Sequence, residues 1–292
     1  MISDKAQETR KARRRHRRAA GRAGGGTLFA LVLHALRSQL RSVIVWGLAL
    51  GLLSVVTVAS FPALEEQAPA INELLESYPP EMRELFGAGE GTDLTTIEGF
   101  LASQVFNFMA PLALAFFPIL AASNAIAGAE ERGTIDVLLG NPIPRWQLVW
   151  SSFVATALSL LGILGILGLA TWGPAVALDV ELSSAKTAEA VLNLWPLCAF
   201  FGGLAMLCSA LFHRRLLAVA IPGAVLVASY FVNALGNTVE ELEDARPFTA
   251  FYYYGSAIED GIEWARFGGV TLAALLLVLL ATLAFSRRDI YT

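Results

Sequence analysis

Six long stretches of the 292-residue chain contain no Asp, Glu, Lys or Arg over twenty or more consecutive positions. A helix needs about 20 apolar residues to cross about 30 Å of hydrocarbon, so each stretch is long enough to span a bilayer. A lipid-exposed backbone satisfies its hydrogen bonds only as a helix or a closed barrel, and the strict alternation of barrel strands is absent. The sequence therefore predicts an all-α membrane protein with six transmembrane helices, at about residues 42–64, 99–123, 147–172, 190–212, 216–237 and 267–286.

The charges between these stretches are sorted by sign. Charged residues make up 16% of the chain, against about 25% in an average globular domain. With six spans both termini lie on one side, which holds residues 1–41, 130–145, 213–215 and 287–292. That side carries 17 Lys and Arg against 6 Asp and Glu, and the other side carries 4 against 19. Because Lys and Arg concentrate in cytoplasmic loops, we expect a multi-pass protein of the cell membrane with both termini in the cytoplasm.

The region before the first span divides into two parts. Residues 1–26 are crowded with Arg and Lys, so mutual repulsion predicts a disordered cytoplasmic tail. Such a tail could mark topology and attract anionic headgroups, bind nucleic acid, or remain solvated; the first is favoured, since no aromatic or structured module accompanies the arginines. Residues 27–41 place apolar and polar side chains on opposite helix faces. They predict an interfacial helix lying in the membrane plane, with an extension of the first span as the alternative.

The first outer loop, residues 65–98, is long and acidic, with nine carboxylates and only Arg83 as counter-charge. Pro80 can open a short helix over 81–86, closed by Gly87. The carboxylates lack the spacing of a calcium-binding loop, so the sequence predicts a solvated acidic surface and no metal site.

The spans themselves contain only mild polar groups. Charged residues inside a membrane mark proton relays and ion pathways, and the six stretches contain no Asp, Glu, Lys, Arg or His. Gln104, Asn107 and Asn233 are candidates for lining a substrate path. Gly47 and Gly51 predict a close approach between helices, and Cys198 and Cys208 are interpreted as small packing residues.

The loop over residues 124–146 carries the one mechanistic motif. Thr134 is a suitable N-cap and Asp136 suits the positive end of a helix dipole. Leu138 and Leu139 give a small apolar face before Gly140 and Pro142 end the helix. A helix this short needs a surface to pack on, and the residues alone leave a lipid headgroup layer and a partner protein equally open.

This loop resembles the signature of ABC-2-type transporter permeases, the membrane subunits of a class of ATP-driven exporters. Gly128, Glu131, Gly133, Thr134, Leu138, Leu139, Pro142 and Arg145 match the family pattern, while Ala129 and Pro144 depart from it. The chain's ending around 285–290 and the order of its spans are also similar. The resemblance implies a coupling helix that docks on a nucleotide-binding subunit, formed by Glu130, Glu131, Arg132, Gly133, Thr134, Asp136, Leu138, Leu139, Pro142 and Arg145. The alternative is that these charges only anchor the span ends at the headgroups.

The chain lacks sequence motifs for chemistry of its own. It has no G-x-x-x-x-G-K-[ST] phosphate loop, no HExxH zinc motif and no nucleophile elbow. We therefore expect no catalytic residues and no bound cofactor, with ATP and Mg held by a separate ABC ATPase subunit. The resemblance also implies a second permease subunit, either a copy or a paralogue, and contact with membrane lipids but not with nucleic acid. The expected function is export of an amphipathic or hydrophobic substrate, and the alternative is a stand-alone secondary carrier or channel.

Overall fold

A computed structural model describes residues 2–65, 67, 73, 77–85, 93, 95–133 and 144–288, without the side chains of residues 2–25, 64, 65, 80, 84 and 85. Six helical segments of this described part are long and apolar enough to cross a membrane, which confirms the predicted fold class. The elements in chain order are α1 (Ile2–Glu65), α3 (Pro80–Leu85), α4 (Ile97–Leu101), the π-helix η1 (Ala102–Met109), α5 (Ala110–Ala125), α6 (Ala127–Glu131), α8 (Arg145–Ala177), α9 (Ser184–Leu211), α10 (Arg215–Leu235), α11 (Glu240–Glu243), the 3₁₀ turn η2 (Arg246–Phe248), α12 (Ala257–Asp260) and α13 (Trp264–Arg287).

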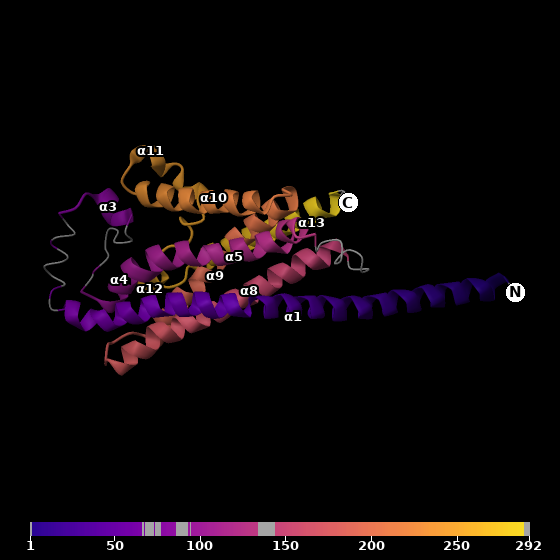
Figure 1. Ribbon diagram of the computed structural model, residues 1–292, viewed down its shortest axis with the longest axis horizontal. Helices are drawn as coiled ribbons and strands as arrows, with labels where there is room; N and C mark the ends of the chain where they lie inside the picture. The colour runs from indigo at the N-terminus through magenta and orange to yellow at the C-terminus, as the bar shows by residue number, and fades with distance from the viewer. Residues whose placement is uncertain are drawn as a thin grey trace.

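The long helices form one elongated bundle (Figure 1). The start of α1 and the end of α13 lie toward the same end of the bundle, which we call the terminal end. The short helices α3, α4, α11 and α12 lie toward the opposite end, which we call the loop end. An even number of crossings requires this arrangement, and the terminal end is the one predicted to be cytoplasmic.

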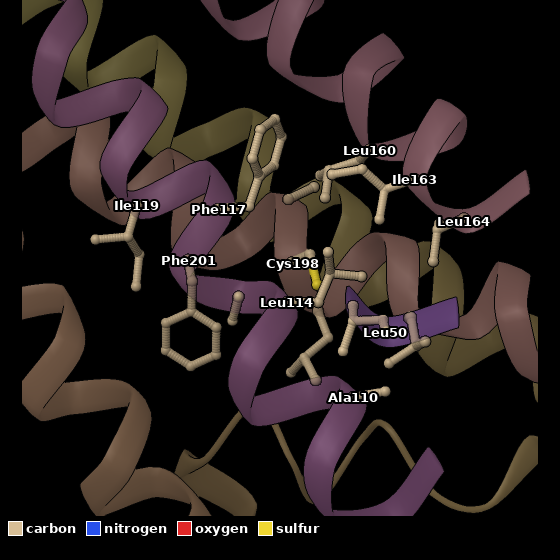
Figure 2. Packing of buried hydrophobic residues seen from close by; sticks show 14 of the residues in the cluster. Leu50, Ala110, Leu114, Phe117, Ile119, Leu160, Ile163, Leu164, Cys198 and Phe201 are labelled. Atoms are coloured by element: carbon tan, nitrogen blue, oxygen red, sulfur yellow. The ribbon is translucent and has the colours of Figure 1, made fainter. Parts of the chain in front are cut away.

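Helix α9 lies at the centre of the bundle. It contacts α5, α8, α10 and α13. In its most apolar 18-residue stretch 72% is buried, against 22% in that of α13. Cys198 and Phe201 of α9 lie among the apolar side chains of α5 and α8, including Leu114 and Leu160 (Figure 2). Cys198 is buried, as is Cys208, and neither is in a disulfide, which agrees with their predicted role as packing residues.

Helices α1 and α8 pack closely over much of their length. A Cβ on Gly47 would lie 2.6 Å from the Ile166 side chain, and a Cβ on Gly51 would lie 3.1 Å from that of Ala170. Further along, the hydroxyls of Ser54 and Thr171 are 2.6 Å apart in a buried hydrogen bond. The two glycines therefore allow the close approach that the sequence predicted.

The structure differs from the prediction for the first 41 residues. Helix α1 is continuous from Ile2 to Glu65, so the structure shows neither a disordered tail over 1–26 nor a separate interfacial helix over 27–41. The physical reason is that no proline precedes Pro62 in this helix, and Ala, Arg and Lys favour helix. From Gly26 on, the helix belongs to the first membrane-spanning segment. The position of residues 27–41 relative to the membrane plane stays a prediction.

The other spans start and end near the predicted positions. The candidate segments are Ile97–Ala125, Arg145–Ala177, Ser184–Leu211, Arg215–Leu235 and Trp264–Arg287. In the first outer loop, α3 covers nearly the residues predicted from Pro80 onward. Helix α8 ends in a left-handed residue, Asp179 with φ 55°, which lets the Val180 N–H return to the Ala175 carbonyl at 2.9 Å.

Candidate functional site

At the terminal end, the second span breaks between α5 and α6. A straight α-helix would pair the Ala127 N–H with the Ser123 carbonyl. Instead, the Ser209 hydroxyl of α9 lies between them, accepting from the Ala127 N–H at 2.9 Å and donating to the Ser123 carbonyl at 3.4 Å. A side chain inserted in this way satisfies both backbone groups while the helix changes direction.

Glu130, in the last turn of α6, binds the end of the last span. Its carboxylate accepts from the Arg288 guanidinium at 2.6 Å, and both side chains are largely buried, at 18% and 9% exposed. Arg288 also donates to the carbonyls of Ser209 and Ala210, at 3.4 and 3.1 Å. Because the last carbonyls of a helix have no partner within it, Arg288 caps the end of α9 while Glu130 balances its charge.

Glu131 caps a different helix. Its carboxylate accepts from the backbone N–H of Arg215 at 2.7 Å, at the first residue of α10. A carboxylate at this position satisfies an unpaired N–H and complements the positive end of the helix dipole. The two adjacent glutamates therefore connect α6 directly to α10 and to Arg288 at the end of α13. Through Arg288, they also connect it to the end of α9.

Arg145, the first residue of α8, caps the end of α13. Its guanidinium donates to the carbonyls of Phe285, at 3.1 Å, and Arg288. It also lies over the Phe285 ring, 5.6 Å from the centroid. The two ends of the 124–146 loop thus hold the same end of α13, one through Glu130 and the other through Arg145.

Arg132 and Gly133 are exposed where the described part of the loop ends. The Arg132 guanidinium makes only long contacts with Asn124, 3.5 Å to the side-chain oxygen and 3.4 Å to the carbonyl. Gly133 has φ 65°, which glycine adopts without strain.

The structure thus brings together Glu130, Glu131, Arg132 and Arg145 of the predicted coupling residues. Thr134, Asp136, Leu138, Leu139 and Pro142 lie outside the described residues, so the short coupling helix stays a prediction. Sequence reasoning assigned no role to four residues that complete the network: Ser209, Arg215, Arg288 and Asn124. The one signal for Arg288 was its place in the family-like ending of the chain.

The predicted path residues lie on two helices. Gln104 and Asn107 are on η1, and Asn233 is on α10. The side-chain oxygens of Asn107 and Asn233 are buried without a hydrogen-bond partner among the described residues. The helices meet nearby, where the rings of Phe108 and Tyr230 are 5.9 Å apart. These facts do not test whether the three residues contact a substrate, so that assignment stays a prediction.

The π-helix η1 has a clear local cause and a partner in the last outer loop. The Ala110 N–H bonds to Val105, five residues back, and Pro111, next in line, has no N–H to give. The Phe106 carbonyl therefore lacks a backbone donor, and the Tyr254 hydroxyl donates to it at 2.8 Å. The Tyr254 carbonyl in turn accepts from the Asn193 amide of α9 at 2.6 Å. Burial raises the pKa of Tyr254, which keeps its hydroxyl protonated as a donor.

Within the described residues, no group of three or more His, Cys, Asp or Glu side chains is placed to hold a metal ion. At the terminal end, the short helix α6 is bonded to the ends of several spans, so a movement of one can be transmitted to the others. A bundle of six apolar helices with a charged loop joined to its helix ends agrees with the fold that the sequence predicted.

Comparison with known families agrees. The model of the ABC-2 family of transporter proteins matches residues 29–290, nearly the whole chain. The chain belongs to this family. Among curated proteins none matches the chain.

Proposed function

We propose that this chain is the permease subunit of an ABC exporter, driven by an ATPase subunit on a separate polypeptide that holds ATP and Mg. Family membership supports the class, and the helix-end network supports the mechanism. Glu130 and Glu131 bond α6 to Arg288 and to the start of α10. A force applied to the segment after Gly133 therefore reaches the ends of α9, α10 and α13 together.

We further propose the setting in which this force acts. The terminal end faces the cytoplasm of the cell membrane, because 17 of the 21 Lys and Arg belong to that side. A second permease subunit, a copy or a paralogue, completes the pathway. The substrate is amphipathic or hydrophobic, since the six uncharged stretches offer no Asp, Glu, Lys, Arg or His to carry a proton or small ion.

The experiment that tests this proposal replaces Glu131 and Arg132 together with Ala in the complex with the ATPase subunit. Glu131→Ala removes the cap on α10, and Arg132→Ala removes the exposed cation beside it. Transport should fall about tenfold, within the usual range of coupling free energies between sites, while ATP turnover and membrane insertion persist. Transport into vesicles and phosphate release are measured on the same preparation.

The matched control is Glu263→Ala with Arg266→Ala, an exposed pair at the loop end with the nitrogen and oxygen 2.7 Å apart. It removes the same two residue types and should leave transport unchanged. Unchanged coupling in the Glu131 and Arg132 variant would remove this loop from the mechanism. Substrate movement without any ATPase subunit would instead support a stand-alone carrier or channel.

A further inference from the structure

A polar cavity of about 290 Å³ lies between α1, α5 and α8 at the terminal end. Ser38, Gln39 and Ser42 of α1 line one wall, Ser152 of α8 lines another, and Arg132 lies at its rim with Asn124. Phe117 and Leu120 of α5 form an apolar wall. Binding sites for small ligands start at about 300 Å³, so the space accommodates a headgroup rather than a whole lipid.

The charge in this cavity is positive and lacks a counter-charge. Arg132 has no carboxylate within 4.0 Å among the described residues, and its contacts with Asn124 are long. The two neighbouring carboxylates are already engaged, Glu130 by Arg288 and Glu131 by the Arg215 N–H. A planar guanidinium with free N–H groups suits the oxygens of a phosphate.

The cavity also contains an unused hydrogen-bond acceptor. Gln39 donates through its amide nitrogen to the Thr156 hydroxyl at 3.2 Å. Its side-chain oxygen is buried with no partner in the described part of the chain. A buried acceptor without a donor costs free energy, so a ligand that carries a hydroxyl beside its phosphate would satisfy both ends of the cavity.

The depth of the cavity indicates where the ligand comes from. Trp46 also lines it, eight residues after Ser38 and close to the start of the first uncharged stretch. Tryptophans concentrate at the level of the headgroups. The polar wall therefore lies at headgroup depth.

We infer that this cavity binds the headgroup of an anionic phospholipid, with Arg132 on the phosphate and Gln39 accepting from a headgroup hydroxyl. This inference does not depend on the transport proposal, because binding needs neither an ATPase subunit nor a substrate.

The test measures phosphatidylglycerol binding to the purified full-length protein in neutral detergent by native mass spectrometry. Arg132→Gln should weaken binding about tenfold, the loss of one charge-assisted contact, and Arg132→Lys should restore part of it. Gln39→Leu should weaken phosphatidylglycerol but not phosphatidic acid, which has the phosphate without the glycerol hydroxyls. Arg214→Gln is the matched control, because it removes an exposed cation at the same end outside the cavity.

Three outcomes would overturn the inference. Equal phosphatidylglycerol binding by the wild type and Arg132→Gln would exclude the cavity as the site. Equal binding of zwitterionic phosphatidylcholine would exclude recognition of the anion. Displacement of the lipid by low concentrations of inorganic phosphate would indicate a site for the free anion instead. Size-exclusion elution that matches the wild type shows that each variant is folded.

Discussion

The two ends of the bundle solve the same problem with different chemistry. At the terminal end, charged side chains satisfy the unpaired backbone groups: Arg288 on α9, Arg145 on α13 and Glu131 on α10. At the loop end, neutral groups do so: the Tyr254 hydroxyl on Phe106 and the Asn193 amide on Tyr254. The difference teaches that the helix-end contacts of Arg288, Arg145 and Glu131 depend on ionisation and on salt, whereas those of Tyr254 and Asn193 do not.

Replacing Glu130 with Ala should have the largest effect. It leaves the Arg288 guanidinium, only 9% exposed, without its carboxylate. An unpaired, largely buried charge costs roughly 2–4 kcal/mol of unfolding free energy. Thermal unfolding of the detergent-solubilised protein should show the loss, and a Glu130→Ala, Arg288→Ala double variant should lose less than the sum of the two single variants.

Glu263→Ala provides the comparison at the loop end. Its partner is Arg266, and both side chains are well exposed, so the change should cost only about 0–1 kcal/mol. Equal losses in Glu130→Ala and Glu263→Ala would mean that the terminal network contributes no more than an ordinary surface pair.

Tyr254→Phe should have an intermediate effect at the loop end. It removes one hydroxyl and leaves the Phe106 carbonyl without a donor. The expected cost is about 1–2 kcal/mol, measured by the same thermal unfolding, and it should not change with salt. Tyr253→Phe, at an exposed neighbour, is the control. A strong salt dependence in Tyr254→Phe would contradict the contrast between the two ends.

Glu259→Gln tests a carboxylate at the loop end whose pKa is raised. Burial raises the pKa of Glu259 above its ordinary value of 4.5, Asp260 adds to the rise, and Ser256 and Lys186 oppose it. The folded protein therefore holds this proton more tightly than the unfolded chain. The resulting stability is fully present below pH 4.5 and is lost as the pH rises through the folded pKa.

The neutral Gln should consequently make the protein more stable than the wild type at neutral pH, with the gain disappearing in acid. Thermal unfolding between acidic and neutral pH measures the effect, which we expect to be smaller than that of Glu130→Ala or Tyr254→Phe. A gain for Glu259→Gln that grows toward acid would reverse the sign and exclude burial as the cause.

The spans and their order could be predicted from the sequence, because a long stretch without charged residues is recognisable from neighbouring residues alone. The boundary between an interfacial helix and the first span stays a prediction, since an amphipathic pattern shows which face is apolar but not whether the axis turns. The bond between Glu130 and Arg288 joins residues 158 positions apart, and no local pattern encodes that pairing. The π-helix escaped prediction for a similar reason: Pro111 frees a carbonyl, but only the fold brings Tyr254 to it.

The Ser209 hydroxyl between Ala127 and Ser123 has a mechanical consequence. In a regular α-helix the bond between Ser123 and Ala127 must break before the last turn can swing, whereas here contacts with a side chain of another helix already replace that bond. The junction of α5 and α6 can thus act as a hinge, because the following segment tilts without breaking an α-helical backbone bond. Because the rest of the bundle is closely packed, such a tilt would move the ends of α10 and α13, to which α6 is bonded.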